Sequence, residues 1–271
     1  NSIPGINIMS EDETNVIIEA GAGVVWDELV QFCVDKNYGG IENLSIIPGS
    51  VGAAPIQNIG AYGQELKDTF LELKGIFTET GEEKIFKKSD CEFSYRSSIF
   101  KTEVANKFVI TSLKLKLNKN PQIITPFKQL EEELNKQGIN DLTLKDVRNT
   151  IIKIRNKKLP DPKEIGNAGS FFKNPIIAKE KYLKLKNSYP DMISYPVNGE
   201  HIKIAAGWLI EKCGWKGKRI GNVGTYKDHA LVIVNYGDAS GDEIFDFEGH
   251  IKHAVELKFG IRLENEVNII S

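Results

Sequence analysis

The sequence predicts an α+β fold divided into two parts. Asn15 to Glu19 (NVIIE) is short and β-branched, and Phe108 to Leu117 alternates apolar and polar residues, so both predict strands. Asp242 to Phe259 places apolar residues three and four apart, which predicts an amphipathic helix. Two prolines in Leu159-Pro160-Asp161-Pro162 disfavour helix and sheet alike, so we place a domain boundary there.

The chain is long enough for both parts to have a core. It has 271 residues, 41% of them hydrophobic, which suits one large domain or two moderate ones. We expect a first domain at residues 1–158 and a smaller α+β domain at residues 159–260. Residues 261–271 are expected to return to the first part as a C-terminal strand.

Local signals define the remaining elements. Val25 to Asn37 has apolar residues at helical spacing, and Tyr38-Gly39-Gly40 ends that predicted helix. Phe70 to Phe86 alternates around Thr80-Gly81, which predicts a hairpin. Gly260 should stop the last helix. We also expect helices at Phe127 to Gln137, Leu144 to Lys157, Ala178 to Lys186 and Lys203 to Lys212, and strands at Ala230 to Val234 and Ile261 to Ile270.

Two glycine-rich segments are candidates for ligand binding. Ile46 to Gly63 carries four glycines and two prolines with almost no charge, so it packs either against a flat ligand or as a buried crossover loop. Gly166 to Pro175 (GNAGSFFKNP) places Ser170 between glycines and two aromatic residues. This second segment either presents one hydroxyl in a dry pocket or is a turn that leads into a buried strand.

The charges and cysteines exclude several classes of protein. The formal net charge is −2, with 35 basic and 37 acidic residues, so no basic excess indicates a nucleic-acid partner. Three distant cysteines show no zinc spacing, and we expect reduced thiols in a cytoplasmic protein. His250 and His253 lack a third ligand nearby, so we expect a solvated surface and no metal site. No apolar run has the length of a membrane span.

Several blocks, in order along the chain, resemble the bacterial UDP-N-acetylenolpyruvoylglucosamine reductase (MurB) family. They are GNAGSFFKNP, Gly40 to Gly63, Phe93 to Lys101 (FSYRSSIFK), Lys203 to Gly217 and Leu263 to Val267 (LENEV). The YRxSIF block and the long middle segment are similar to the type I branch. The resemblance implies a FAD-binding domain of the vanillyl-alcohol-oxidase/PCMH-like class, followed by a smaller substrate-binding domain.

The resemblance also implies a reaction. NADPH reduces FAD, which then reduces UDP-N-acetylglucosamine enolpyruvate to UDP-N-acetylmuramate, a peptidoglycan precursor for cell wall biogenesis, cell shape, the cell cycle and cell division. By this resemblance Ser170 is the proton donor, while Arg96 and Glu266 act at the substrate carboxylate. Taken alone, Arg96 is either paired structurally or available to an anion, and Glu266 is also suited to keeping an edge strand soluble.

Binding residues follow from the same resemblance. The FAD contacts implied are Gly49, Ser50, Gly52, Ala53, Gln57, Asn58, Gly60 and Tyr62. The substrate contacts implied are Lys158, Asn174, Lys173, His229 and Phe127. His229 stands where many relatives have glutamine, and Pro126-Phe127 stands where this branch has a tyrosine, which removes one hydroxyl.

The start of the chain, Asn1 to Gly5, resembles the middle of a domain. We therefore expect the first half of the FAD-binding domain, with its diphosphate-binding turn, to be absent. Two further hypotheses stay open: a redox-inactive module that binds a UDP-sugar or a protein partner, and a different flavin oxidase, which the positions of Arg96, Ser170 and Glu266 disfavour. We expect a monomer with no nucleic-acid or membrane partner.

Overall fold

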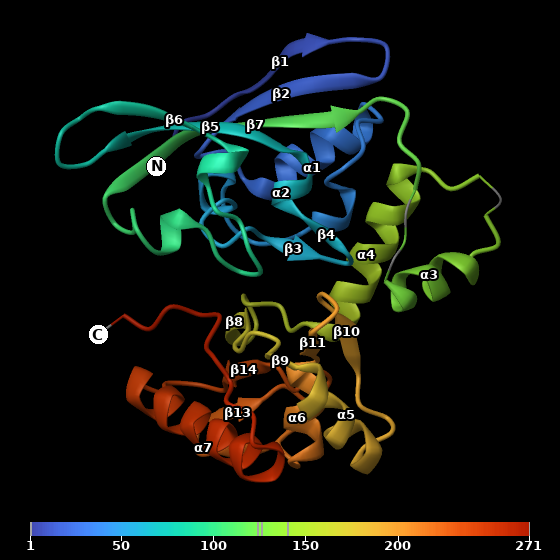
Figure 1. The fold of residues 1–271 in the computed structure, drawn as a ribbon, viewed down its shortest axis with the longest axis vertical. Helices are drawn as coiled ribbons and strands as arrows, with labels where there is room; N and C mark the ends of the chain where they lie inside the picture. The colour runs from blue at the N-terminus through green and yellow to red at the C-terminus, as the bar shows by residue number, and fades with distance from the viewer. Residues whose placement is uncertain (1, 124, 126, 140, 271) are drawn as a thin grey trace. The chain divides into compact units, whose positions relative to one another are not determined.

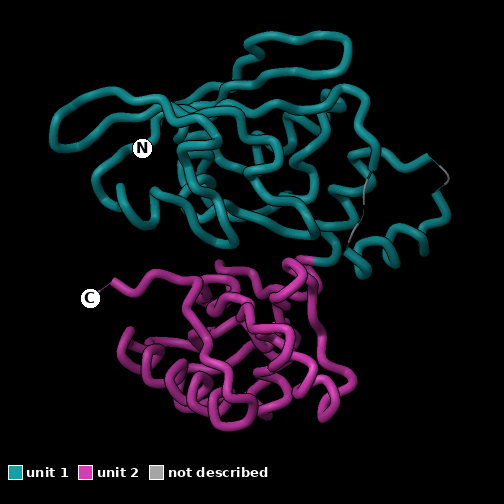
Figure 2. The backbone as a smooth tube through the Cα atoms, in the orientation of Figure 1, with its two compact units in different colours: residues 1–154 teal, residues 155–271 magenta. Residues whose placement is uncertain are grey.

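The computed structural model describes residues 2–123, 125, 127–139 and 141–270. The chain forms two compact units, residues 1–154 and 155–271, which Figure 2 colours separately. Each unit has its own hydrophobic core, and the two are described here one at a time.

The first unit is built on an antiparallel sheet with the strand order β1-β2-β7-β5-β6 (Figure 1). Helices and short turns pack on one face of it. The strands are β1 (Ile6–Glu11), β2 (Asn15–Gly21), β5 (Phe70–Phe77), β6 (Glu83–Lys87) and β7 (Phe108–Asn118), with the small hairpin β3 (Gly60–Ala61) and β4 (Gln64–Glu65). The helices are α1 (Trp26–Asp35), α2 (Leu66–Thr69), α3 (Lys128–Asn135) and α4 (Leu144–Lys158), the last of which continues into the second unit.

Alternation along the central strands explains this core. In β2 the side chains of Val16, Ile18 and Ala20 are at most 1% exposed, while the alternate residues Asn15, Ile17 and Glu19 are partly exposed. α1 buries Trp26 and Leu29 against the same core. The predicted strands, the hairpin of β5 and β6, and the helix α1 are confirmed. β1 was not predicted, because five of its six residues are exposed and it lacks a clear apolar face.

The second unit contains two small sheets and a long helix. Its sheets have the orders β10-β11-β9 and β12-β13-β14-β8. The strands are β8 (Gly166–Ser170), β9 (Ile176–Ala178), β10 (Ser194–Pro196), β11 (His201–Ile204), β12 (Arg219–Ile220), β13 (Val223–Thr225) and β14 (Val232–Asn235). The helices are α5 (Lys179–Ser188), α6 (Ala206–Lys212) and α7 (Gly241–Phe259).

α7 shows why its boundaries were predictable. Ser240 accepts a hydrogen bond from the N–H of Glu243, whose side chain accepts one from the N–H of Ser240 in return. At the other end Gly260 has a φ of 61°, a left-handed conformation that glycine adopts without steric cost. The predicted helix and its stop at Gly260 are confirmed.

Two predicted elements were wrong in part. Lys203 and Ile204 belong to strand β11, and the helix begins only at Ala206, because residues 201–204 pair with β9 and β10. The strand predicted from Ile261 to Ile270 is reduced to one bridge, Asn265 with Phe172. Ile261 and Leu263 anchor this segment in the core, whereas Ile269 and Ile270 are exposed.

Within the part of the chain that the structure describes, no helix is both long enough and apolar enough to span a bilayer.

Candidate functional site

Ser170 is the last residue of β8, and contacts of the residues just before it determine its backbone conformation. The side-chain oxygen of Asn167 accepts a hydrogen bond from the N–H of Gly169 at 3.0 Å. Gly169 has a φ of 72°, which favours glycine, and Ser170 pairs with Val232 of β14. The Ser170 residue is exposed, so its hydroxyl is presented at the surface of the second unit.

Two buried aromatic side chains follow the serine. Phe171 is 7% exposed and Phe172 is 1% exposed, and their rings contact each other edge to face at 5.2 Å. Both pack in the core of the second unit. The N–H of Phe171 also donates to the carbonyl of Leu231 at 2.8 Å. The buried rings and this hydrogen bond together fix the backbone next to Ser170.

Glu266 lies on a backbone segment that is hydrogen-bonded to residues 171–173, just after Ser170. Its N–H donates to the carbonyl of Phe171 at 2.8 Å, and the N–H of Lys173 donates to the carbonyl of Glu264 at 2.9 Å. The Lys173 ammonium also forms an ion pair with Glu264 at 3.1 Å. The structure therefore brings together Ser170 and Glu266, which are 96 positions apart, on neighbouring backbone segments.

His229 lies in an environment of positive charge just before β14. Burial, followed by the charges of Lys158 and Lys216, lowers the pKa of its imidazole from 6.5 to about 4. Burial and the Lys216 charge also lower the pKa of Lys158. Lys158, Lys216 and His229 lie close enough to disfavour one another's protonated forms. A bound anion would offset this repulsion, so the cluster is suited to binding one.

The side chain of Asn174 makes a hydrogen bond within the second unit. The side-chain oxygen of Asn174 accepts the N–H of Ala206, the first residue of α6, at 2.9 Å. Asn174 thereby joins the segment that carries Ser170 to that helix.

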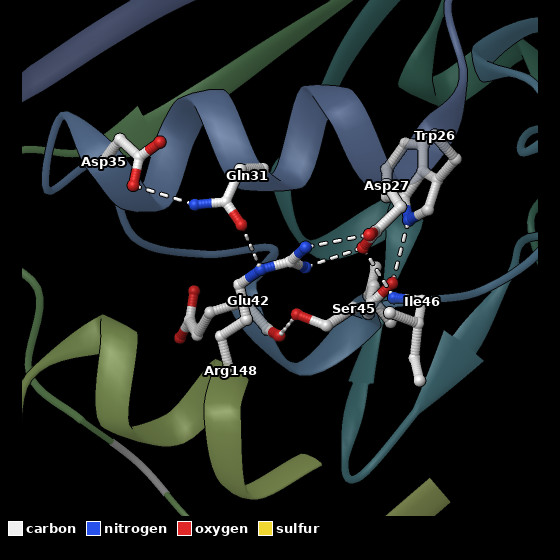
Figure 3. A network of polar contacts seen from close by, with 9 residues as sticks. Trp26, Asp27, Gln31, Asp35, Glu42, Ser45, Ile46 and Arg148 are labelled. Atoms are coloured by element: carbon white, nitrogen blue, oxygen red, sulfur yellow. Dashed lines mark hydrogen bonds and ion pairs between the residues drawn. The ribbon is translucent and has the colours of Figure 1, made fainter. Parts of the chain in front are cut away.

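The first unit holds the segment from Ile46 to Gly63 in place through the network in Figure 3. Arg148, which is 5% exposed, donates two hydrogen bonds to the carboxylate of Asp27, at 2.6 and 2.8 Å. Asp27 also accepts the N–H of Ile46 at 2.6 Å, and the indole of Trp26 donates to the carbonyl of Leu44 at 2.9 Å. A bidentate ion pair thus fixes the start of the glycine-rich segment.

Backbone pairing continues along this segment. The N–H of Val51 donates to the carbonyl of Val24 at 2.8 Å, and the N–H of Gly52 donates to the carbonyl of Ala22 at 2.9 Å. A Cβ at Gly52 would lie 2.7 Å from that of Ala22, so only glycine allows this approach. Gly49 differs, because it has a φ of 119° and open space where its Cβ would stand. The backbone at Gly49 is therefore open on that side, and the expected FAD contacts Ser50 and Ala53 are partly and fully exposed, respectively.

Asn58 is engaged within the protein. It is fully buried, its amide nitrogen donates to Glu65 and to the carbonyl of Ser94, and its amide oxygen accepts the N–H of Lys67. Its side chain shapes the segment from inside, while Gln57 beside it is partly exposed.

Arg96 packs on the same segment. It has a φ of 55°, and its guanidinium donates to the carbonyl of Gly60 at 2.8 Å. The rings of Tyr62 and Phe127, the expected cofactor and substrate contacts, meet edge to face at 5.3 Å. Pro126 lies outside the described residues. Arg96 belongs to the first unit, whereas Ser170 and Glu266 belong to the second.

Sequence reasoning missed several residues around these segments. The pair of Asp27 and Arg148 joins positions 121 apart, which no local pattern indicates. Lys216 was not singled out, although it acts on both Lys158 and His229. Glu248 was overlooked too, and a signal existed: it falls three and seven residues before Ile251 and Val255, on the apolar face of its helix.

His250, His253 and the three cysteines are the side chains that the sequence analysis considered as metal ligands. Among the described residues, no group of three or more His, Cys, Asp or Glu side chains is arranged to hold a metal ion. His250 and His253 are exposed, and His250 stacks on Trp215. Cys33, Cys91 and Cys213 are free thiols.

Comparison with known families gives two matches. Residues 161–270 match the family described as UDP-N-acetylenolpyruvoylglucosamine reductase, C-terminal domain, and residues 4–85 match the family described as FAD binding domain. The predicted fold class, an FAD-binding domain followed by a smaller α+β domain, is confirmed.

Individual relatives agree. The chain is 49% identical over 269 residues to a UDP-N-acetylenolpyruvoylglucosamine reductase of Flavobacterium johnsoniae, covering 99% of this chain and 80% of that protein. It is 46% identical to the protein of the same name from Pseudomonas syringae, covering 98% of this chain and 78% of that protein. The crystal structure of the Thermus caldophilus reductase matches with a TM-score of 0.62 at 24% identity, over 92% of this chain and 71% of that chain, which supports the fold alone.

Proposed function

This chain belongs to the UDP-N-acetylenolpyruvoylglucosamine reductase family, and from that premise we propose a role for each residue of its site. The chain is a flavin-dependent oxidoreductase that reduces UDP-N-acetylglucosamine enolpyruvate to UDP-N-acetylmuramate, with FAD and NADPH as cofactors. We assign cofactor binding to residues 1–158 and substrate binding to residues 159–260.

The reaction adds a hydride and a proton across the alkene of the enolpyruvyl group. FAD, when bound and reduced by NADPH, supplies the hydride. Once hydride has added to the terminal carbon, negative charge develops on the carbon next to the carboxylate. The protein must therefore stabilise charge at the carboxylate and deliver one proton to the second carbon.

Ser170 is the proton donor in this proposal. Its hydroxyl is a weak acid, yet an enolate-like carbon is a stronger base, and a site that excludes water allows the transfer. The geometry in support is local: Gly169 and Asn167 set the turn, and the buried rings of Phe171 and Phe172 hold the backbone that follows. Ser170 is thus presented on a rigid segment, which suits a residue that must deliver a proton to one carbon.

Arg96 and Glu266 act at the substrate carboxylate. The planar guanidinium of Arg96 matches a carboxylate with two parallel hydrogen bonds. Glu266 is partly exposed and holds the carboxylate through a shared proton or an intervening donor. Its N–H bond to Phe171 keeps it on the backbone segment next to Ser170.

The remaining residues bind the two ligands. Gly49, Ser50, Gly52, Ala53, Gln57, Asn58, Gly60 and Tyr62 form the FAD segment. Lys158, Lys173, Asn174, His229 and Phe127 contact the substrate. Lys158 and His229 are suited to the diphosphate, because burial and neighbouring cations disfavour positive charge there until an anion is bound.

We further propose that the protein is a cytoplasmic monomer whose product supports cell wall biogenesis, cell shape, the cell cycle and cell division. Sedimentation equilibrium of the FAD-loaded protein tests the monomer, and a concentration-dependent dimer contradicts it.

The observation that carries the function is the occurrence of both family matches, in order, with Ser170 and Glu266 on hydrogen-bonded neighbouring segments. The test is to load the protein with FAD and follow NADPH oxidation with UDP-N-acetylglucosamine enolpyruvate. Substrate-dependent oxidation, with a product two hydrogens heavier by mass spectrometry, is expected. Flavin absorbance without substrate-dependent turnover would overturn the assignment and favour a module that binds a UDP-sugar.

A further inference from the structure

Glu248 is a buried acid in the interior of the second unit. It lies on α7, is 1% exposed, and shares the core side of the helix with Phe247 and Ile251. Charged side chains are almost never this buried unless they are paired. Glu248 accepts a hydrogen bond from Lys252, one turn along the helix, at 2.9 Å.

The second contact of Glu248 reaches a distant part of the chain. The amide nitrogen of Asn265 donates to the same carboxylate oxygen, Oε1, at 3.4 Å. Asn265 is the residue directly before Glu266, and its backbone forms the bridge with Phe172. A buried carboxylate on α7 thus holds the side chain of the residue next to Glu266.

The arrangement around Asn265 is not the most favourable one for stability. Its amide oxygen, Oδ1, is buried and has no hydrogen-bond partner within the described ranges. A buried polar atom without a partner destabilises the folded state. Residues that break such a local rule are concentrated at functional sites.

We propose that Glu248 and Asn265 are positioning residues that hold Glu266 beside Ser170. This inference rests on the proposed role of Glu266 in the reaction. Glu264 and Glu266 are joined to the segment after Ser170 by the hydrogen bonds to Lys173 and Phe171. Asn265 lies between Glu264 and Glu266, and its side chain reaches Glu248 on α7. The contact with Glu248 therefore fixes the residue between the two backbone hydrogen bonds.

Four variants test this arrangement: Asn265→Ala, Asn265→Asp, Glu248→Gln, and the double variant Glu248→Gln/Asn265→Asp. Asn265→Ala removes the contact, and Asn265→Asp places two carboxylates side by side, which repel each other. In the double variant the new amide of position 248 donates to the new carboxylate of position 265. Glu256→Gln is the matched control, because Glu256 is on the same helix and pairs with the exposed Arg262.

The first readout does not need the cofactor. Amide hydrogen exchange of Glu266 should be faster in Asn265→Ala and Asn265→Asp, and should return towards the wild-type rate in the double variant. The thermal midpoint of Asn265→Ala should change little, because the lost contact is long and a buried atom without a partner is also removed.

The second readout separates the two halves of the reaction. Reduction of bound FAD by NADPH should be unchanged, while its reoxidation by the enolpyruvyl substrate should slow about ten- to a hundredfold in Asn265→Ala and Asn265→Asp. The double variant should recover most of that loss. Wild-type reoxidation in both Asn265→Ala and Asn265→Asp, or no recovery in the double variant, would overturn the proposal. Absence of reoxidation in the wild-type protein would instead count against the proposed function, and the exchange readout would still decide the positioning role.

Discussion

The N–H of Glu266 donates to the carbonyl oxygen of Phe171 at 2.8 Å, one residue after Ser170. This hydrogen bond is one of the contacts that join the two segments of the second unit that carry Ser170 and Glu266. Neither Ser170 nor Glu266 is held by a long regular element, since β8 has five residues and the segment of Glu266 forms only a bridge. The geometry of the pair therefore depends on packing of the buried rings that follow Ser170.

Replacing Ser170 with alanine should separate the two halves of the reaction. Bound FAD should still be reduced by NADPH, because the hydroxyl takes no part in that step. Reoxidation by the enolpyruvyl substrate should slow about 10²–10⁴-fold, the usual contribution of a positioned acid. Stopped-flow absorbance measures both rates, with Ser188→Ala, an exposed serine at the end of α5, as the control. Normal reoxidation in Ser170→Ala would remove the serine from the acid role.

His229 should make the stability of the protein depend on pH. Burial and neighbouring lysines lower its pKa to about 4, so the folded protein keeps the imidazole neutral where the unfolded chain binds a proton. Between the ordinary value of 6.5 and about 4, the unfolded state binds more protons, and the free energy of unfolding falls as the pH falls. Above this window the histidine contributes no pH dependence.

His229→Gln tests this directly, because glutamine does not titrate. From about pH 7 to about pH 5, the wild-type protein should lose about 1–2 kcal/mol more than the variant. Urea unfolding of both proteins at the two pH values gives the difference, in which the other titrating groups cancel. Parallel losses in the two proteins would show that folding does not lower the pKa of His229.

The sequence predicted correctly those helices and strands whose start, end and apolar spacing are visible within one contiguous segment. α7 could be predicted because its apolar spacing and its stop at Gly260 are both read within one segment. The segment of Ile261 to Ile270 could not, because its alternation is the same whether it forms a strand or a bridge. What decides is the partner, and among the described residues the recorded pairing of this segment is the bridge between Asn265 and Phe172.

The candidate site shows the same division. Ser170, Arg96 and Glu266 were found through motifs, and motifs are contiguous in sequence. Glu248 was not singled out, since acids on an amphipathic helix usually face solvent. Its burial results from the packing of α7 on β13, β14 and α6, which all precede it in the chain and which composition does not reveal.

Removing Arg148 should weaken the first unit and its FAD segment together. Arg148→Met leaves Asp27, with a side chain 28% exposed, without its bidentate partner. Loss of one partner from a largely buried pair should lower the free energy of unfolding by about 2–4 kcal/mol. Urea unfolding measures it, with Lys136→Met, which removes an exposed ion pair to Glu133, as the control expected to change little.

The same variant should bind FAD more weakly, because Asp27 also holds the N–H of Ile46 at the start of the glycine-rich segment. Arg148→Lys keeps the positive charge but loses the bidentate hydrogen bonding to Asp27. We therefore expect losses of stability and FAD affinity between those of the wild-type protein and Arg148→Met. Equal stability of Arg148→Met and the wild-type protein would show that the network in Figure 3 contributes nothing measurable.

Gly52 should be sensitive to a single methyl group. A Cβ there would lie 2.7 Å from the Cβ of Ala22 and 3.1 Å from its carbonyl oxygen, closer than packed atoms tolerate. In Gly52→Ala the two backbones must separate, which strains the hydrogen bond between them and should cost about 1–3 kcal/mol of stability. FAD affinity, measured by quenching of flavin fluorescence, should fall with it, because the moved segment is the one we assign to the cofactor. Gly241→Ala is the matched control, since no atom lies within 4 Å of its added Cβ and alanine favours a helix. If Gly52→Ala binds FAD as tightly as Gly241→Ala does, the approach of residue 52 to Ala22 does not shape the cofactor site.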